Sequence, residues 1–154
     1  MKKIFVFAAL ISVLTTGCLK DDSKPCKPKT LEQDMPGMTK FAADHSINTT
    51  KDESGILYEI INPGSDKKPN VNSKIVAKYV GLNLSGVQFD SGQFSEPYAL
   101  SGLIEGWQII LQKIGEGGKM KMIIPSGLAY KCYAPTQSTL NQPLYFDVEL
   151  ISVN

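Results

Sequence analysis

The most distinctive candidate for binding chemistry in this chain of 154 residues is its single tryptophan, Trp107. It follows Gly106, and a glycine lets another backbone or a ligand come close because it has no side chain. An indole ring in that position can form a flat apolar floor for a bound group. Ordinary core packing is the alternative, because buried aromatic side chains dominate protein cores.

No arrangement of side chains indicates covalent or metal-dependent catalysis. The single histidine, His45, stands beside no recognisable nucleophile or acid, so we expect a surface residue. The cysteines Cys18, Cys26 and Cys132 do not have the spacing of metal ligands. Cys26 and Cys132 could pair in an oxidising compartment, but the sequence does not give their separation in space, so this pairing stays open. We therefore expect no metal and no cofactor.

The element that would position Trp107 is predicted from hydrophobic spacing. Apolar residues recur three and four positions apart from Leu103 to Ile114, which predicts a short helix over about 103–113 with Trp107 on its apolar face. We expect no other convincing helix in the folded body, and only one or two helical turns between Met38 and Ser46.

Five further segments are predicted to be strands, because apolar and polar residues alternate in them or turn residues bound them. They cover residues 55–62, 73–84, 87–91, 119–124 and 144–151. In the last segment Leu144, Phe146, Val148 and Leu150 are expected to face inward, with Tyr145, Asp147 and Glu149 outward. The pattern predicts an α+β fold, in which an antiparallel sheet has one wet face and one face packed on the helix.

Residues 1–17 are predicted to be a signal peptide and not part of the fold. Two lysines precede an apolar run from Ile4 to Leu14, which is too short to span a membrane. The ending Leu14-Thr-Thr-Gly-Cys18 is similar to the lipobox of bacterial lipoproteins. The similarity implies that Cys18 carries acyl chains and anchors the mature protein to a membrane. An ordinary signal peptide with an incidental cysteine is the alternative.

Residues 18–37 are predicted to be a lipidated, flexible tether, because they are rich in lysine, aspartate and proline. Acidic residues after Cys18 are similar to signals for the outer membrane, so we expect a lipoprotein of the bacterial cell envelope, anchored to the outer membrane and either periplasmic or surface-exposed. A solvated charge cluster is the alternative. A short helix and linker are expected over 38–52. All 16 basic residues are lysine, and the lack of arginine argues against nucleic acid as a partner.

Six short motifs, in the right order and at nearly the right spacing, resemble those of the FKBP-type peptidyl-prolyl cis-trans isomerases. They are Glu53-Ser-Gly-Ile-Leu-Tyr58, Val76-Ala-Lys-Tyr-Val-Gly81, Phe89-Asp-Ser91, Tyr98-Ala-Leu100 with Leu103-Ile-Glu-Gly-Trp107, Ile124-Pro-Ser-Gly-Leu-Ala-Tyr130 and Leu144-Tyr-Phe-Asp-Val-Glu-Leu150. The resemblance implies an FKBP-like domain over 53–154. Its fold would be a half-open antiparallel β-sheet wrapped around one short α-helix.

The resemblance also implies a site in which the substrate proline ring lies on Trp107. Substrate-binding side chains around it would be Tyr79, Phe89, Leu103 and Phe146. The implied catalytic groups are the Ile104 backbone N–H and the Tyr130 hydroxyl, which would each donate to a substrate carbonyl, and the Asp90 carboxylate, which would sit at the rim bonded to Tyr79.

The implied function is prolyl isomerisation in an apolar aromatic pocket, assisting the folding of envelope proteins. Partners would be proline-containing polypeptides and FKBP-type macrolide inhibitors, with the membrane contacted only through the lipid anchor. Three departures from the family pattern support an alternative, a non-catalytic peptide-binding or chaperone module. Glu96 stands where many members have an aromatic wall, Lys131 replaces a common glycine, and the loop 132–141 lacks the usual isoleucine-proline pair, so Tyr130 could be displaced.

Overall fold

The computed structural model describes residues 25–154. The helices are α1 (Leu31–Asp44) and α2 (Glu105–Ile110), with 3-10 turns η1 (Leu100–Gly102), η2 (Leu111–Lys113) and η3 (Ser126–Leu128). The strands are β1 (Thr50–Lys51), β2 (Leu57–Asn62), β3 (Lys74–Asn83), β4 (Gln88–Gln93), β5 (Tyr98–Ala99), β6 (Lys119–Ile124) and β7 (Leu144–Val153). The predicted signal peptide over 1–17, the lipidation at Cys18 and the start of the tether lie outside the described residues.

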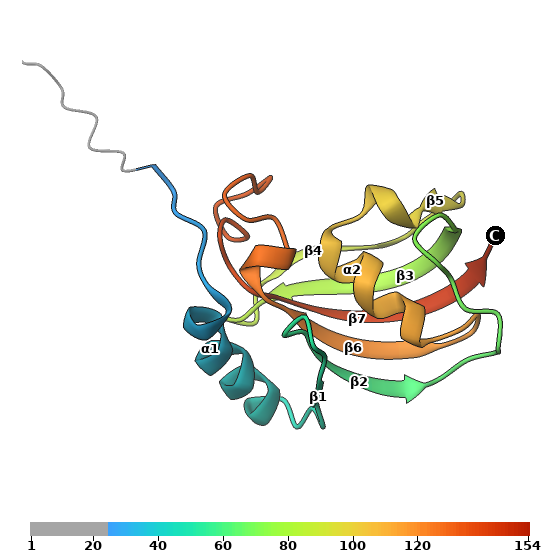
Figure 1. The fold of residues 1–154 in the computed structure, drawn as a ribbon, viewed down its shortest axis with the longest axis horizontal. Helices are drawn as coiled ribbons and strands as arrows, with labels where there is room; N and C mark the ends of the chain where they lie inside the picture. Colours follow the sequence, from blue (N-terminus) through green and yellow to red (C-terminus); the bar gives the residue numbers. More distant parts are fainter. Residues whose placement is uncertain (1–24) are drawn as a thin grey trace, which may run out of the picture.

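One antiparallel sheet holds the strands in the order β1-β2-β6-β7-β3-β4, with the short β5 paired to β3. Figure 1 shows α2 lying across one face of this sheet. The predicted fold, a half-open antiparallel sheet around one short helix, is confirmed. Each of the five predicted strand segments contains a strand, whereas the two-residue strands β1 and β5 were not predicted from the sequence.

The main core lies between α2 and the sheet. The helix predicted over 103–113 is α2 continued by η2, and its apolar residues Trp107, Ile110 and Ile114 are buried. Inward positions of β7 meet this face because side chains alternate along a strand, and Val148 and Leu150 are fully buried there. The spacing of apolar residues thus predicted both the helix face and the sheet face of this core.

α1 is a 14-residue helix that begins at Leu31, so the chain before Met38 differs from the prediction. A tether extending to residue 37, followed by one or two helical turns, is wrong. Thr30 and Gln33 form a capping box, in which the Gln33 N–H donates to the Thr30 hydroxyl and the Thr30 N–H donates to the Gln33 side chain. Pro36 lies inside the helix and removes one backbone hydrogen bond. The reason the helix persists is the apolar surface that α1 buries.

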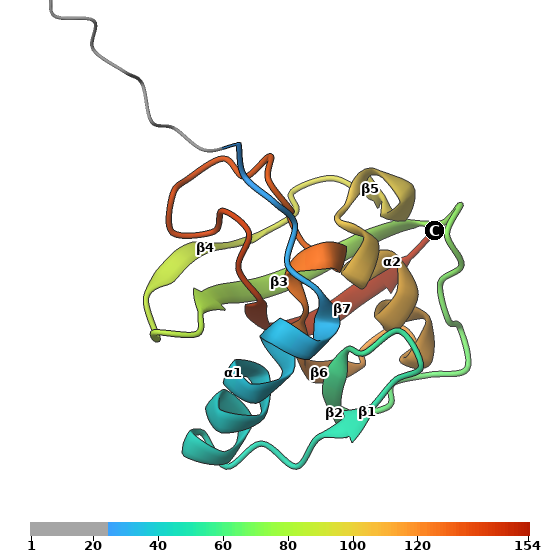
Figure 2. The ribbon, with the colours of Figure 1, turned by 60° about the vertical axis from the view of Figure 1, so that its left-hand side comes forward.

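α1 packs on the face of the sheet opposite α2 and forms a second core (Figure 2). Its residues are Met38, Phe41, Ala42, Ile47, Leu57, Ile123 and Tyr145. A proline inside a helix costs about 3 kcal/mol, whereas burying Met38 and Phe41 contributes about 1.5–3 kcal/mol each. Tyr145 points away from the main core as predicted, but it is only 8% exposed because Phe41 covers it. The prediction of one wet face is therefore wrong at this end of the sheet.

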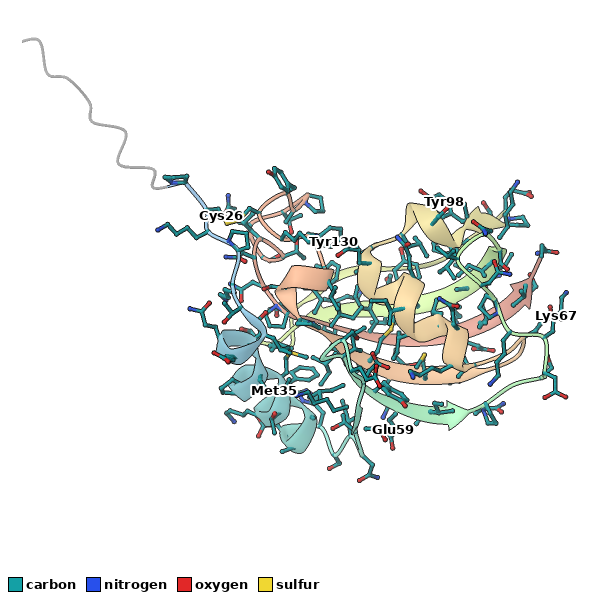
Figure 3. The ribbon with its side chains drawn as sticks, in the orientation of Figure 1. Cys26, Met35, Glu59, Lys67, Tyr98 and Tyr130 are labelled. Atoms are coloured by element: carbon teal, nitrogen blue, oxygen red, sulfur yellow. A yellow bond between two sulfur atoms is a disulfide. The ribbon has the colours of Figure 1, made fainter. Side chains whose placement is uncertain are left out.

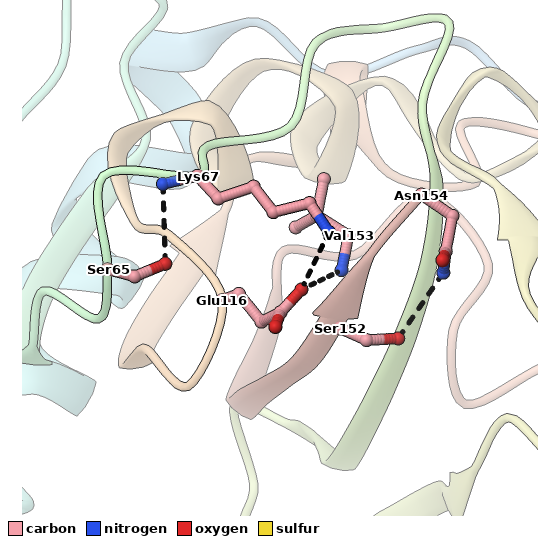
Figure 4. Close-up of polar contacts among 6 residues, drawn as sticks. All are labelled: Ser65, Lys67, Glu116, Ser152, Val153 and Asn154. Carbon is pink, nitrogen blue, oxygen red and sulfur yellow. Dashed lines mark hydrogen bonds and ion pairs between the residues drawn. The ribbon is translucent and has the colours of Figure 1, made fainter.

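Polar links fix the end of β7 to the turn that follows η2. The Glu116 carboxylate accepts hydrogen bonds from the Val153 N–H at 3.0 Å and from the Lys67 ammonium at 3.2 Å (Figure 4). Both contacts lower the pKa of Glu116, the Val153 N–H most. Neighbouring backbone bonds join Gly115 to Pro63 and Glu116 to Ser65. The end of the α2 and η2 segment is thereby anchored to the sheet.

A second polar link holds η2 from the side of the β1–β2 turn. The Asp52 carboxylate accepts from the Ser54 hydroxyl and backbone N–H at 2.6 and 2.9 Å and pairs with the Lys113 ammonium at 3.0 Å. These hydrogen bonds, those from Ser54 first, lower the pKa of Asp52 to about 2.

Within residues 25–154, no helix is both long and apolar enough to cross a membrane.

Candidate active site

A cavity of about 90 Å³ opens between α2 and the concave face of the sheet. It is lined by residues of β3, β4, α2 and β7, of the segment after β4, of the segment between η1 and α2, and of the loop after β6. Its lining residues are Tyr79, Asp90, Phe94, Leu103, Ile104, Trp107, Tyr130 and Phe146. Seven of the eight residues predicted for the site are therefore brought together, from segments spread over more than 60 positions of the chain.

Trp107 closes the bottom of the cavity, and its side chain is almost fully buried. Tyr79 and Phe146 stand edge-on to the indole, with ring centroids 5.4 and 5.3 Å away, the arrangement that aromatic quadrupoles favour. Gly106 lets α2 lie this close to the sheet, because a Cβ at that position would overlap the side chain of Ile124. Core packing and a binding floor are thus compatible at Trp107.

Phe94 is the wall residue that the sequence reasoning missed. Its ring centroid lies 5.6 Å from that of Tyr79 and 6.4 Å from that of Trp107. Glu96, which the resemblance placed at this wall, is exposed and is not among the lining residues. The available signal was that Phe94 is the one large apolar residue in the polar stretch 90–96.

Phe89 does not line the cavity directly. It packs edge-on against Phe146, at 5.7 Å between ring centroids, and against Tyr130, at 6.5 Å. Both of these residues do line the cavity, so Phe89 supports the wall from behind. The role of Phe89 as a substrate-binding side chain stays a prediction.

The polar groups of the cavity are two phenols and a carboxylate. The Tyr79 hydroxyl donates to Asp90 Oδ2 at 2.8 Å. Burial first, and then this hydrogen bond, raises the pKa of Tyr79 to about 12. Burial and the negative charge of Asp90 also raise the pKa of Tyr130. Both phenols are therefore protonated at neutral pH, and the Tyr130 hydroxyl has no protein partner within residues 25–154.

The backbone N–H of Ile104 is a second unpaired donor among the described residues. Gln108 Nε2 donates to the Leu103 carbonyl at 2.7 Å and to the Ser101 carbonyl at 3.3 Å. The Leu103 carbonyl and the Ile104 N–H belong to one planar trans peptide unit, so they point in opposite directions. Gln108 therefore also fixes the direction of the Ile104 N–H at the cavity.

Tyr130 keeps its place in the lining despite the altered loop after it. Lys131 adopts a positive φ of 53° and its ammonium pairs with Glu105 at 3.1 Å, across the start of α2. Cys132 is joined by a disulfide to Cys26, with Cα atoms 5.8 Å apart, which answers the question that the sequence left open (Figure 3). His45 lies at the end of α1 and stacks on Phe41, away from the cavity lining.

These groups can bind an apolar ring between aromatic walls and donate two hydrogen bonds to carbonyl oxygens above it. Among residues 25–154, no set of three or more His, Cys, Asp and Glu side chains is placed to hold a metal ion. The arrangement is thus suited to hold a small apolar group through shape and a few hydrogen bonds.

Comparison with known proteins assigns the family. Residues 65–151 match the family model of the FKBP-type peptidyl-prolyl cis-trans isomerase, and the chain belongs to this family. It is 34% identical over 117 residues to FKBP-type peptidyl-prolyl cis-trans isomerase FkpA of Escherichia coli strain K12, an alignment covering 74% of this chain and 43% of FkpA. The chain thus matches less than half the length of that relative.

Two solved structures are similar in fold. The crystal structure of Escherichia coli FkpA superposes with a TM-score of 0.68 at 26% identity, over 80% of this chain and 61% of that one. A peptidyl-prolyl cis-trans isomerase from Pseudomonas syringae pv. tomato gives a TM-score of 0.65 at 28% identity, over 83% of this chain and 98% of that one. The half-open sheet and its helix are therefore the family's fold.

Proposed function

We propose that this chain is a peptidyl-prolyl cis-trans isomerase that binds X-Pro segments in the aromatic cavity. The observation that carries the proposal is the combination of an apolar floor at Trp107 with two unpaired donors, the Ile104 N–H and the Tyr130 hydroxyl. Family membership supports it, because the matched family is named for this activity. Phe94 supports it as well, since an aromatic side chain stands at the wall where Glu96 was expected.

The barrier to be lowered is rotation about the bond preceding proline. A peptide bond resists rotation by roughly 18–20 kcal/mol because resonance gives its C–N bond double-bond character. The charge-separated resonance form is stabilised by water, so an apolar cavity weakens that support. Binding the twisted bond more tightly than either planar form lowers the barrier further, and each 1.36 kcal/mol gained is about tenfold in rate.

Each polar group has a defined part in this scheme. The proline ring lies on Trp107 between Tyr79, Leu103 and Phe146, while Ile104 donates its N–H to the substrate carbonyl that follows proline. Tyr130 donates its hydroxyl to a second substrate carbonyl and limits the positions that the bound chain can take. Asp90, held by Tyr79 at the rim, places negative charge beside the twisting peptide unit. No step requires a covalent intermediate.

We also propose that the protein works in the bacterial cell envelope, tethered to the outer membrane through acylated Cys18. Support comes from the sequence before the described residues and from the disulfide, which is typical of an oxidising compartment. Proline-containing segments of envelope proteins are then its substrates, and FKBP-type macrolides its inhibitors. Replacing Cys18 by alanine should release the protein from membranes; retention there would contradict the anchor.

The decisive experiment measures prolyl isomerisation by the full chain in detergent, on short peptides varied before proline. We expect acceleration that a titrated FKBP-type macrolide abolishes, with a matching change in the fluorescence of Trp107, the only tryptophan. Tyr130→Phe should lower kcat/KM, and Tyr133→Phe, a change to an exposed tyrosine, is the matched control. Binding without acceleration would instead identify a non-catalytic peptide-binding module. If neither binding nor acceleration were observed, the chain would share only the fold with the family.

A further inference from the structure

We propose that the N-terminal arm, residues 25–30 together with Asp34 of α1, is a positioning element of the cavity. It holds the pocket loop, residues 125–143, so that Tyr130 lines the cavity, and opening the Cys26–Cys132 disulfide weakens catalysis. This inference rests on the proposed isomerase function. It adds to that function a part of the chain that lies outside the matched family region, residues 65–151.

The disulfide ties the arm to the pocket loop close to the functional group. Cys26 and Cys132 are 106 positions apart in the sequence. Cys132 is two residues beyond Tyr130, inside a turn closed by the Tyr133 N–H donating to the Tyr130 carbonyl at 2.9 Å. A constraint on Cys132 is therefore transmitted through two peptide units to Tyr130.

A second link runs through Asn141 at the far end of the loop. Its side-chain amide donates to the Lys27 carbonyl at 2.7 Å and accepts from the Lys29 N–H at 3.0 Å, pairing with the arm much as a strand would. Its backbone N–H donates to the Lys131 carbonyl at 2.7 Å. Asn141 adopts a φ of 50°, a left-handed conformation that asparagine tolerates better than most residues. It thereby joins the arm to the residue after Tyr130, and Figure 2 shows the arm running beside the loop.

The third link is a buried carboxylate at the base of the loop. Asp34, 3% exposed, accepts from the Ser126 N–H at 2.8 Å and from the Ser126 hydroxyl at 2.6 Å. The Ser126 carbonyl in turn accepts from the Lys131 N–H at 3.2 Å. The second oxygen of Asp34 has no hydrogen-bond partner within residues 25–154, so burying this carboxylate carries a desolvation cost. Its bonds go to the loop that carries Tyr130.

These links matter because the pocket loop has little structure of its own. Between η3 and β7 no strand is formed, and the backbone bonds there close only turns or cross within the loop. Segments with few regular hydrogen bonds open most easily, so without the arm the loop samples other conformations. If Tyr130 then occupied its place for a tenth of the time, the apparent affinity for the substrate would fall about tenfold.

The test compares the oxidised chain with the double variant Cys26→Ser/Cys132→Ser at a temperature where thermal melts show both folded. We expect kcat/KM to fall about tenfold, mainly through KM. Glu116→Gln weakens the hydrogen bond between Glu116 and the Val153 N–H at the end of β7, far from the pocket loop. This variant is the control for general loosening and should leave kcat/KM unchanged. Dithiothreitol should reproduce the loss in the native chain. It supplies two electrons and two protons, which convert the disulfide to two thiols, and is itself oxidised to its cyclic disulfide. Reoxidation of the protein should restore activity.

Epistasis separates positioning from mere stability. In a Tyr130→Phe background, removing the disulfide should change kcat/KM by no more than about twofold, because the hydroxyl it positions is already gone. An additive loss, or wild-type kcat/KM in the serine variant, overturns the proposal.

Amide hydrogen exchange keeps the two proposals distinguishable. Faster exchange over residues 126–142 of the serine variant, with unchanged exchange rates in β6 and β7, supports the positioning role of the arm. This holds even if the oxidised chain shows no isomerase activity and the proposed function fails. Unchanged exchange in the loop overturns the arm's positioning role.

Discussion

Adding one methyl group at Gly106 should push α2 away from the sheet and displace Trp107 from the bottom of the cavity. A Cβ built on Gly106 would lie 2.8 Å from Cδ1 and 3.0 Å from Cγ1 of Ile124, and closer still to its Cγ2. In a helix with free space, glycine to alanine is stabilising by about 0.8–1 kcal/mol. Overpacking a core costs about 1–3 kcal/mol, so crowding outweighs the helix propensity and Gly106→Ala should be destabilising by about 1 kcal/mol.

Activity should suffer more than stability in this variant. A misplacement of about 1 Å at a site can cost about 100-fold, so even half that displacement of Trp107 predicts a loss of about tenfold in kcat/KM. The assay pairs isomerisation kinetics with thermal melts, in which a loss of 1 kcal/mol lowers Tm by about 4 °C. Gly127→Ala is the matched control, because a Cβ there meets no atom within 4 Å. If Gly106→Ala were as stable as the native chain, the steric reasoning would be refuted.

A rescue experiment identifies the clashing partner. Ile124→Ala alone removes buried methyl groups and should cost about 2–5 kcal/mol. Combined with Gly106→Ala, it should cost at least about 1 kcal/mol less than the sum of the two single changes, because the methyl at position 106 then occupies vacated space. A purely additive pair would show that Ile124 is not what the new methyl group meets.

Three further predictions follow from the site and its supports. Gln108→Glu replaces a donor to two carbonyls by a carboxylate that repels them, so kcat/KM should fall about tenfold; Gln112→Glu, on the exposed side of the same helix segment, should leave it unchanged. Phe94→Ala should weaken macrolide binding by about 1 kcal/mol or more, measured by Trp107 fluorescence, whereas Glu96→Ala should have no effect. The folded-state pKa of Asp52, about 2, lies below its ordinary value of 3.8, so its contribution to stability is present above pH 4 and is lost as the pH falls toward 2. Urea unfolding between pH 7 and 2 should therefore show a steeper acid loss in the native chain than in Asp52→Asn, and equal slopes would contradict the assignment.

Regular hydrophobic spacing carried most of what could be predicted about the fold. β3 and β7 alternate because one of their faces is buried against α2, and the same face explains why the stripe over 103–113 has helical spacing. Seven of the eight site residues that the family resemblance implied line one cavity, including Tyr130, which lies in the loop between η3 and β7 rather than on a regular element. Phe94 was missed because the resemblance placed that wall at Glu96, and because Phe94 lies just past β4, where no periodic pattern shows which way a side chain points.

The first half of α1 was missed for a different reason. Its first two turns contain Pro36 and Gly37, both poor helix formers. What stabilises the helix is the capping box at Thr30 and burial against Tyr145, and the second of these is a contact between segments about 100 positions apart. The Cys26–Cys132 disulfide is non-local in the same way. Local sequence reasoning has no access to such pairings, so the sequence left the disulfide open and placed the start of the helix too late.

These non-local contacts also change what counts as the functional unit. The resemblance suggested a domain over 53–154, and the family match covers 65–151. A chain starting at residue 53 would expose Leu57, Ile123 and Tyr145, which α1 now covers, and would leave Cys132 without its partner. Exposed apolar surface of that kind favours association rather than a stable monomer. The unit that keeps both cores and the arm on the pocket loop therefore includes Cys26. Activity measured on a shorter piece would describe a cavity whose pocket loop is not held by the arm.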